Sequence, residues 1–137
     1  MKKYMILTLI FSFLFSTTVC ADERVSLGYI YAPSQSHFQI VDNTYGNINV
    51  VSPTCLDINV DGHLEVNNIF DESFVISMHE KNIKVTPFFS NHWGRERARK
   101  TLEMPETVAT ELIEVIDRYS FDGVNIDLEN LLPEDKD

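Results

Sequence analysis

Residues 122–129, DGVNIDLE, carry two kinds of side chain on the two faces of one short strand. Side chains alternate along a strand, so Asn125, Asp127 and Glu129 are expected to point one way and the apolar residues between them the other way. The apolar face suits packing against helices. Burying two acids and an amide on a strand is costly unless they hydrogen-bond one another or serve chemistry. The polar face is therefore expected to line the interior or the mouth of a barrel.

The order of the other expected elements favours a parallel sheet. Strand signals occur in four segments, residues 25–32, 48–52, 83–89 and 120–128. A weak helix is expected between the first two strands, within residues 34–45. An amphipathic helix is expected from the capping residue Asp71 to about Lys81, and a longer one from Pro105 to Tyr119, with an apolar stripe that includes Ile113. Strands that are apolar at most positions and alternate with helices are typical of a parallel sheet covered by helices.

Residues 55–66 alternate apolar and polar side chains around Asp61-Gly62, which predicts a small hairpin. Asp57, Asn59 and Asp61 also imitate the first half of a calcium-binding loop, but Asn68 stands where such loops have a glutamate that binds the ion through both oxygens. A hairpin turn is therefore favoured, and no metal site is predicted. The four histidines lack ligand spacing and are interpreted as surface or loop residues: His37, His63, His79 and His92.

Residues 1–21 have the pattern of a secretory signal peptide, with two lysines, an apolar run too short to span a bilayer comfortably, and small residues ending at Ala21. Cleavage after Ala21 would leave residues 22–137 as one domain without a membrane anchor, secreted or in the cell envelope. A lipoprotein that uses Cys20 is the less favoured alternative, because Val19 is not the small residue usual before such a cysteine.

Charge and cysteine content exclude several classes of protein. The chain has 21 acidic and 11 basic residues, and cleavage would remove two lysines, which makes the surface more acidic still. Such a surface disfavours binding to nucleic acid or to anionic membranes. Cys55 would be the one cysteine after cleavage, so no intramolecular disulfide is expected.

The DGVNIDLE segment resembles the DxxDxDxE signature of glycoside hydrolase family 18, the chitinases and their relatives, with Asp122, Asp127 and Glu129 at the matching positions. Asn125 stands where many chitinases have an aspartate. This change resembles the branch that contains spore-cortex and peptidoglycan hydrolases, so peptidoglycan is favoured over chitin. Weaker similarities to the first three strands of the family occur at Gly28-Tyr29, at residues 50–53 (VVSP) and at residues 84–93 (KVTPFFSNHW).

The resemblance implies an α/β fold of the TIM (β/α)8 barrel type and a substrate-assisted retaining mechanism. Glu129 would protonate the glycosidic oxygen, and Asp127 would orient the N-acetyl group of the substrate, whose oxygen attacks the anomeric carbon. No cofactor or metal is required, and the partner is a polysaccharide that contains N-acetylglucosamine. The remaining expected site residues are Tyr29 and Asn125 as sugar contacts and Asp122 as support for the start of the strand.

Two aromatic side chains have alternative interpretations. Tyr29 could line the sugar subsite or simply fill the barrel. Trp93 could stack on a sugar ring or act as a hydrophobic anchor.

A complete barrel of this type has eight strand-helix units and typically about 250 residues. Residues 22–137 supply four expected strands, and the segment around Pro133 resembles the first turn of a fourth helix. The chain is therefore expected to be a truncated barrel with little or no hydrolase activity of its own. Exposed sheet edges predict self-association. The alternative function is that of a non-catalytic, lectin-like sugar binder.

Overall fold

The computed structural model describes residues 24–31, 35–68 and 70–135, so the predicted signal peptide lies outside the described part. The strands are β1 (Leu27–Ile30), β2 (Val50–Pro53), β3 (Leu56–Ile58), β4 (Leu64–Val66), β5 (Lys84–Val85), β6 (Phe88–Ser90) and β7 (Asn125–Asp127). The helices are α2 (Gln35–Asp42), α3 (Ser73–Glu80), α4 (Arg95–Glu103) and α5 (Pro105–Tyr119), followed by a 3-10 turn, η1 (Pro133–Asp135).

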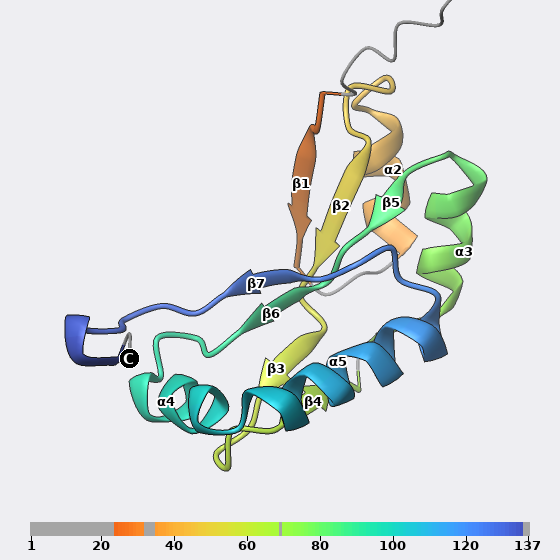
Figure 1. Ribbon diagram of the computed structural model, residues 1–137. Coiled ribbons are helices and arrows are strands. Elements are labelled where there is room, and N and C mark those ends of the chain that lie inside the picture. Colours follow the sequence, from red (N-terminus) through yellow and green to blue (C-terminus); the bar gives the residue numbers. More distant parts are fainter. Residues whose placement is uncertain (1–23, 32–34, 69, 136–137) are drawn as a thin grey trace, which may run out of the picture.

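The strands form two sheets that lie end to end, and the chain passes from the first sheet into the second twice (Figure 1). In the first sheet β1, β2 and β5 are parallel neighbours, and in the second β3, β6 and β7 are parallel neighbours, with β4 antiparallel to β3 at one side. The chain passes from β2 to β3 just after Pro53, and from β5 to β6 through Pro87. Proline has no N–H to donate, which accounts for both interruptions. The single strand predicted at residues 83–89 is therefore wrong in part, because it is divided into β5 and β6.

The parallel strands therefore follow the sequence order, and β4 is an added hairpin strand. Among the described residues, β1 pairs only with β2 and β7 pairs only with β6, so these strands do not close into a barrel. The parallel α/β arrangement that the sequence predicts is confirmed, and the closed barrel is not seen.

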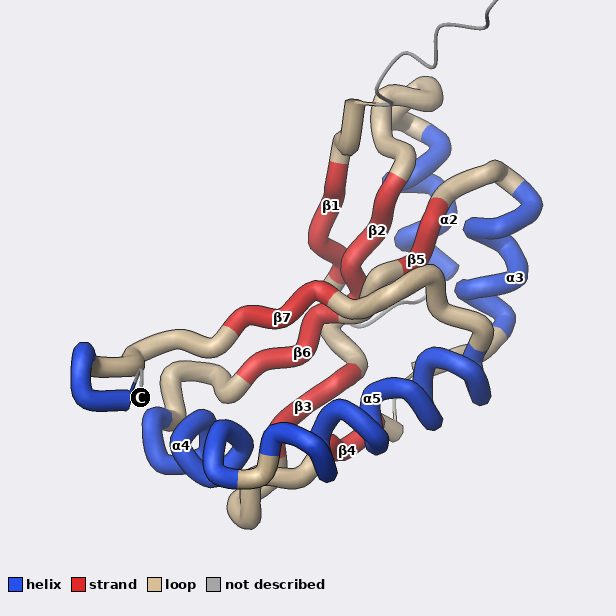
Figure 2. Tube along the Cα trace, viewed as in Figure 1, coloured by secondary structure: helices blue, strands red, loops and turns tan. Residues whose placement is uncertain are grey.

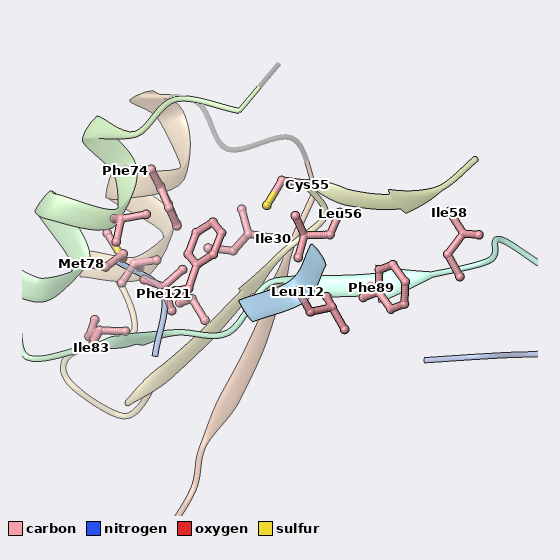
Figure 3. Close-up of a cluster of buried hydrophobic side chains, with 14 of the residues drawn as sticks. Ile30, Cys55, Leu56, Ile58, Phe74, Met78, Ile83, Phe89, Leu112 and Phe121 are labelled. Carbon is pink, nitrogen blue, oxygen red and sulfur yellow. The ribbon is translucent and has the colours of Figure 1, made fainter. Parts of the chain in front are cut away.

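One face of the sheets packs against the helices, and a continuous core lies between them (Figures 1 and 2). In the first sheet Val51 and Val85 are fully buried, and in the second Leu56 and Phe89 are 1% exposed. Helix α3 lies next to β5, α4 next to β3 and α5 next to β4. Figure 3 shows Phe74 and Met78 of α3 in the same cluster as Leu56, Phe89 and Leu112.

Several sequence predictions are confirmed. The hairpin forms, with Leu56 paired to Val66 across it. Helix α3 forms, but its N-cap residue is Glu72 rather than the predicted Asp71. Asp71 lies one residue earlier, where its Oδ1 accepts a hydrogen bond from the Ser73 amide at 2.9 Å, and hydrogen bonding from Ser73 lowers the pKa of Asp71. Helix α5 has the predicted bounds.

Other predictions are wrong in part. Ile113 does not belong to the buried stripe of α5, since it is 59% exposed. The fourth strand is shorter than residues 120–128, because Ser120 has φ 57° and Gly123 has φ 156°, and neither fits a regular strand. Helix α4 was not predicted, because its sequence RERARKTLE has no apolar stripe and buries only Ala98 and Thr101.

A helix that crosses a bilayer needs both length and a sustained apolar character. Within residues 24–31, 35–68 and 70–135, no helix has this combination.

Candidate active site

The site face, defined here as the face of the parallel strands opposite the helices, carries Asn125 and its hydrogen-bond partners. Register places Tyr29 of β1 beside Ser52 of β2, and Phe88 of β6 beside Asn125 of β7. Residues in register on neighbouring parallel strands share a face. The Asn125 side-chain amide donates to Tyr29 Oη and to Ser52 Oγ, each at 3.2 Å. These contacts join β7 to β1 and β2 across the site face.

Tyr29 is an exposed member of this face. Its ring meets the Phe88 ring edge to face, with 5.6 Å between the centroids, while 64% of the residue stays accessible. Ser52, by contrast, is fully buried. Tyr29 therefore presents an aromatic surface to solvent at a point where its hydroxyl is already oriented by Asn125.

Asp127 belongs to a second polar row, two residues beyond Asn125 on the same strand. Ser90 of β6 is the register partner of both Asp127 and Asp57 of β3, so the three side chains share the site face. Asp57 Oδ1 lies 2.6 Å from Nε2 of His92, in the loop after β6. The sequence places Asp57 in the predicted hairpin and His92 on the surface or in a loop, and their pairing could not be anticipated without the register of β3 against β6.

Glu129 lies two residues beyond the last paired position of β7, and its backbone is held by a buried side chain. Asn91 is fully buried, and its Oδ1 accepts a hydrogen bond from the Glu129 amide at 2.8 Å. Asn91 Nδ2 donates to the Glu129 carbonyl at 2.9 Å. Sequence reasoning missed Asn91. The available signal was an amide side chain directly after a strand that neighbours the strand with the two acids.

Trp93 follows in the same loop after β6, with φ 64° and 67% of the residue exposed. Its carbonyl accepts a hydrogen bond from Asn130 Nδ2 at 3.1 Å, so the loops after β6 and β7 are tied together. A ring this exposed is not a buried hydrophobic anchor.

Asp122 lies before β7, at the far end of that strand from Glu129. Its backbone amide donates to the Val85 carbonyl at 2.9 Å, and its Oδ2 accepts from the Val85 amide at 2.8 Å and lies 2.9 Å from His79 Nε2. Partial burial acts to raise the pKa of Asp122, but the Val85 amide, His79 and Lys84 together lower it below its ordinary value. Asp122 therefore connects β5, α3 and the start of β7 rather than facing Asp127.

Metal ligation and thiol chemistry have little support in the described part of the chain. Among the residues that the structure describes, no group of three histidine, cysteine, aspartate or glutamate side chains could hold a metal ion. Burial, with a contribution from nearby Asp57, raises the pKa of the Cys55 thiol to about 12, so this thiol is protonated and unreactive at neutral pH.

Comparison with known proteins gives a match only through structure. No family model matches the sequence, and no curated protein does either. Three solved structures illustrate the similarity. The spore cortex-lytic enzyme SleL of Bacillus cereus matches 82% of this chain with a TM-score of 0.70 at 12% identity. A chitinase from Bacteroides thetaiotaomicron matches 82% with a TM-score of 0.67 at 18% identity, and one from Chromobacterium violaceum matches 76% with a TM-score of 0.63 at 14% identity.

The chain has a chitinase-like fold. The resemblance to chitinases and spore-cortex enzymes that the sequence suggests is thus confirmed at the level of the fold. The matched part is 29% of the length of the SleL structure, 38% of the Bacteroides chitinase and 35% of the Chromobacterium chitinase. Within this chitinase-like fold, Asn125 and Asp127 project from β7 onto the site face, while Asp122 belongs to the opposite end of the strand.

Proposed function

We propose that this chain carries the acid-bearing strands of a glycoside hydrolase that cleaves bonds next to N-acetylglucosamine, with peptidoglycan favoured over chitin. The observation that carries the proposal is the placement of Asn125 and Asp127 on the site face, just before the anchored Glu129, in a chitinase-like fold. The neighbours named as spore cortex-lytic enzymes and the asparagine at position 125 together support peptidoglycan.

In the proposed reaction Glu129 donates its proton to the glycosidic oxygen as the bond to the anomeric carbon breaks. The carbonyl oxygen of the substrate's own N-acetyl group forms the new bond to that carbon, and the Asp127 carboxylate orients the group and stabilises its developing positive charge. Water then attacks the same carbon, the bond from that carbon to the acetamido oxygen breaks, and the water gives a proton to the Glu129 carboxylate, which restores the acid and the N-acetyl group. The protein supplies no nucleophile, so two carboxyl groups are sufficient.

The other site residues would bind the sugar. Tyr29 and Asn125 already hydrogen-bond each other beside Asp127, so they are placed to contact the acetamido group. Exposed Trp93 offers a ring for stacking on a sugar face. Asp122 supports the strand and is not expected to touch substrate.

We further propose that these strands are one half of a TIM barrel. The described strands pair as successive parallel neighbours, and a sugar cleft in such a barrel is built from loops around its whole rim. A polypeptide limited to residues 22–137 is therefore expected to have little or no turnover. Secretion through residues 1–21 would bring the protein to its polysaccharide.

The second candidate is a lectin-like sugar binder without catalysis. The observation in its favour is the accessibility of Tyr29 and Trp93, which are 64% and 67% exposed and could bind sugar without a closed cleft. This function needs the aromatic rings but not an ionisable group at position 129.

Replacing Glu129 by Gln separates the two functions. In the complete natural protein that carries these residues, turnover of peptidoglycan or of N-acetylglucosamine oligomers should fall by about 10²- to 10⁴-fold, because general acid catalysis is lost, while binding is retained. Glu103→Gln on the exposed side of α4 is the matched control and should leave turnover unchanged. Binding without turnover in the unmodified protein would favour the lectin, and turnover that survives E129Q would reject the proposed acid.

A further inference from the structure

The end of β7 poses a structural problem for a catalytic residue at position 129. The backbone ladder between β6 and β7 has its last pair at Ser90 and Asp127, so Glu129 lies beyond the reach of regular strand pairing. A carboxyl group that must protonate a particular oxygen has to be held closely, since a misplacement of about 1 Å can cost a hundredfold in rate. Some other contact has to replace the ladder.

Asn91 provides that contact. Its amide oxygen accepts from the Glu129 N–H at 2.8 Å and its amide nitrogen donates to the Glu129 carbonyl at 2.9 Å. One side chain thus offers the donor and the acceptor that a neighbouring strand backbone would supply. Because Asn91 is fully buried, water does not compete readily for either bond. Asparagine suits this position, since at neutral pH an aspartate carboxylate lacks the donor and an alanine lacks both groups.

The chain on the far side of Glu129 is fixed as well. Asn130 donates to the Trp93 carbonyl at 3.1 Å. Asp135, whose side chain is 3% exposed, accepts from Arg95 Nε at 2.8 Å and from the Leu132 amide at 2.8 Å. The segment from Glu129 to Asp135 is therefore attached to the loop after β6 and to the start of α4 at successive points.

From this arrangement we infer that Asn91 is a positioning residue for Glu129: it extends the β6–β7 pairing by one side-chain step and thereby sets where the carboxyl group projects. The inference deepens the proposed function and rests on it only in treating Glu129 as the acid. Both of these hydrogen bonds of Asn91 go to the backbone of Glu129. The effect of Asn91 on catalysis passes through the Glu129 backbone.

Amide hydrogen exchange tests whether Asn91 holds this backbone. In Asn91→Ala, exchange at the Glu129 amide should become about tenfold faster relative to exchange at the Asn125 amide, because the Glu129 amide loses its hydrogen bond. The Asn125 amide on β7 is a suitable reference, since it donates to the Pro87 carbonyl and not to Asn91. Asn91→Asp is the near-isosteric second variant if N91A does not fold, and it should leave the hydrogen bond to the Glu129 carbonyl broken. Thr101→Val is the control, since Thr101 is a buried hydroxyl that hydrogen-bonds Gly62 and Arg97 and makes no contact with Glu129.

Kinetics on the complete natural protein provides the second readout. N91A or N91D should lower kcat by about 10- to 100-fold with a smaller change in KM, because the Glu129 carboxyl group is displaced. T101V should change neither kcat nor KM, since it leaves the Glu129 carboxyl group in place. N91D keeps an acceptor and is judged by kinetics, whereas N91A removes the acceptor of the Glu129 amide, so an unchanged exchange ratio at Glu129 in folded N91A would overturn the inference. So would a kcat equal to that of the unmodified enzyme when E129Q abolishes turnover. Turnover that survives E129Q would reject the proposed function instead, while the exchange ratio would still report on the Asn91 contact.

Discussion

Asp122 and Asn91 hold the two ends of β7 in place through hydrogen bonds to backbone groups. Each pairs with both backbone groups of a residue on a neighbouring segment: Asp122 uses its carboxylate and its own amide to pair with Val85, and Asn91 uses its side-chain amide to pair with Glu129. The first contact joins β7 to β5, and the second holds the proposed acid beyond the end of the ladder. The strand is thus fixed at both ends by polar side chains.

The charge of Asp122 should make the stability of the protein depend on pH. The pKa of Asp122 is lowered in the folded state, so its contribution is present above the unfolded-state pKa of about 3.9 and is lost as the pH falls through the folded-state value. Asp122→Asn keeps an acceptor for the Val85 amide but removes the charge. At pH 7 it should lower the free energy of unfolding by about 1 kcal/mol, the difference between charged and neutral hydrogen bonds.

Urea unfolding at pH 7 and at about pH 3 measures this effect. The cost of D122N should shrink at the lower pH, where the carboxyl of the unfolded chain is protonated. Asp61→Asn is the control, because the Asp61 side chain is 76% exposed and its nearest cation, Lys100, is 3.8 Å away. A D122N cost that is equal at both pH values would show that the charge makes no contribution.

At the level of elements, side chains of α4 hydrogen-bond the backbone of the β3–β4 hairpin, so the helix and the hairpin stabilise each other. Thr101 donates to the Gly62 carbonyl at 2.9 Å, and Lys100 donates to the Val60 carbonyl at 2.6 Å. Gly62 has φ 91°, and a Cβ at this position would lie 2.7 Å from Lys100 Cβ and 2.9 Å from its backbone carbonyl carbon. The hairpin turn can approach the helix this closely only with glycine.

Gly62→Ala should therefore be considerably more costly than Gly46→Ala. Gly46 also has positive φ, 77°, but a Cβ at this position would have no atom within 4 Å, so only the backbone strain of about 1–2 kcal/mol applies. In G62A overpacking against α4 adds about 1–3 kcal/mol to that strain. Thermal or urea unfolding of the two variants gives the comparison, and equal costs would mean that the hairpin moves away from α4 freely.

The same elements show how far the sequence alone predicts this fold. The approximate positions of the parallel strands, of α3 and of α5 follow from apolar periodicity, and the hairpin follows from alternation around Asp61-Gly62. Helix α4 could not be found this way, because its place is determined by polar contacts such as Thr101 with the hairpin backbone. Its nine residues carry four positively charged side chains and no apolar stripe.

The candidate site, too, could be predicted from the sequence only in part. Alternation along β7 is enough to predict that Asn125 and Asp127 share a face. The contacts of Asn125 with Tyr29 and Ser52 depend on strand register, across sequence separations of 96 and 73 residues. Asn91 lies 38 residues from Glu129, and only the pairing of β6 with β7 brings the two together.

At the scale of the whole molecule, the unpaired edges of the sheets determine whether the polypeptide associates with other copies of itself. Within the described residues, β1 and β7 each have one unpaired edge, and Ile126 on β7 is 58% exposed. Unpaired edges with apolar side chains favour strand pairing between chains. The polypeptide of residues 22–137 should therefore associate as its concentration rises, and more so at high salt, which screens its acidic charge.

Sedimentation velocity over a range of concentrations tests this expectation. Ile126→Lys places a charge on the edge and should shift the distribution towards monomer. Val60→Lys is the matched control, since Val60 is 65% exposed but lies in the hairpin turn away from β7. A monomer at every concentration, or an equal effect of V60K, would be inconsistent with association through this edge.

Our central claim is that the site face binds an N-acetylated sugar with Asp127 at the acetamido group and Glu129 at the scissile oxygen. Its most direct test is a crystal structure of the E129Q variant of the complete natural protein with an N-acetylglucosamine oligomer bound. We predict that Asp127 hydrogen-bonds the acetamido N–H, that Tyr29 lines the same pocket, and that residue 129 lies within hydrogen-bonding distance of the glycosidic oxygen. An oligomer bound away from the site face, or with its acetamido group remote from Asp127, would contradict the claim.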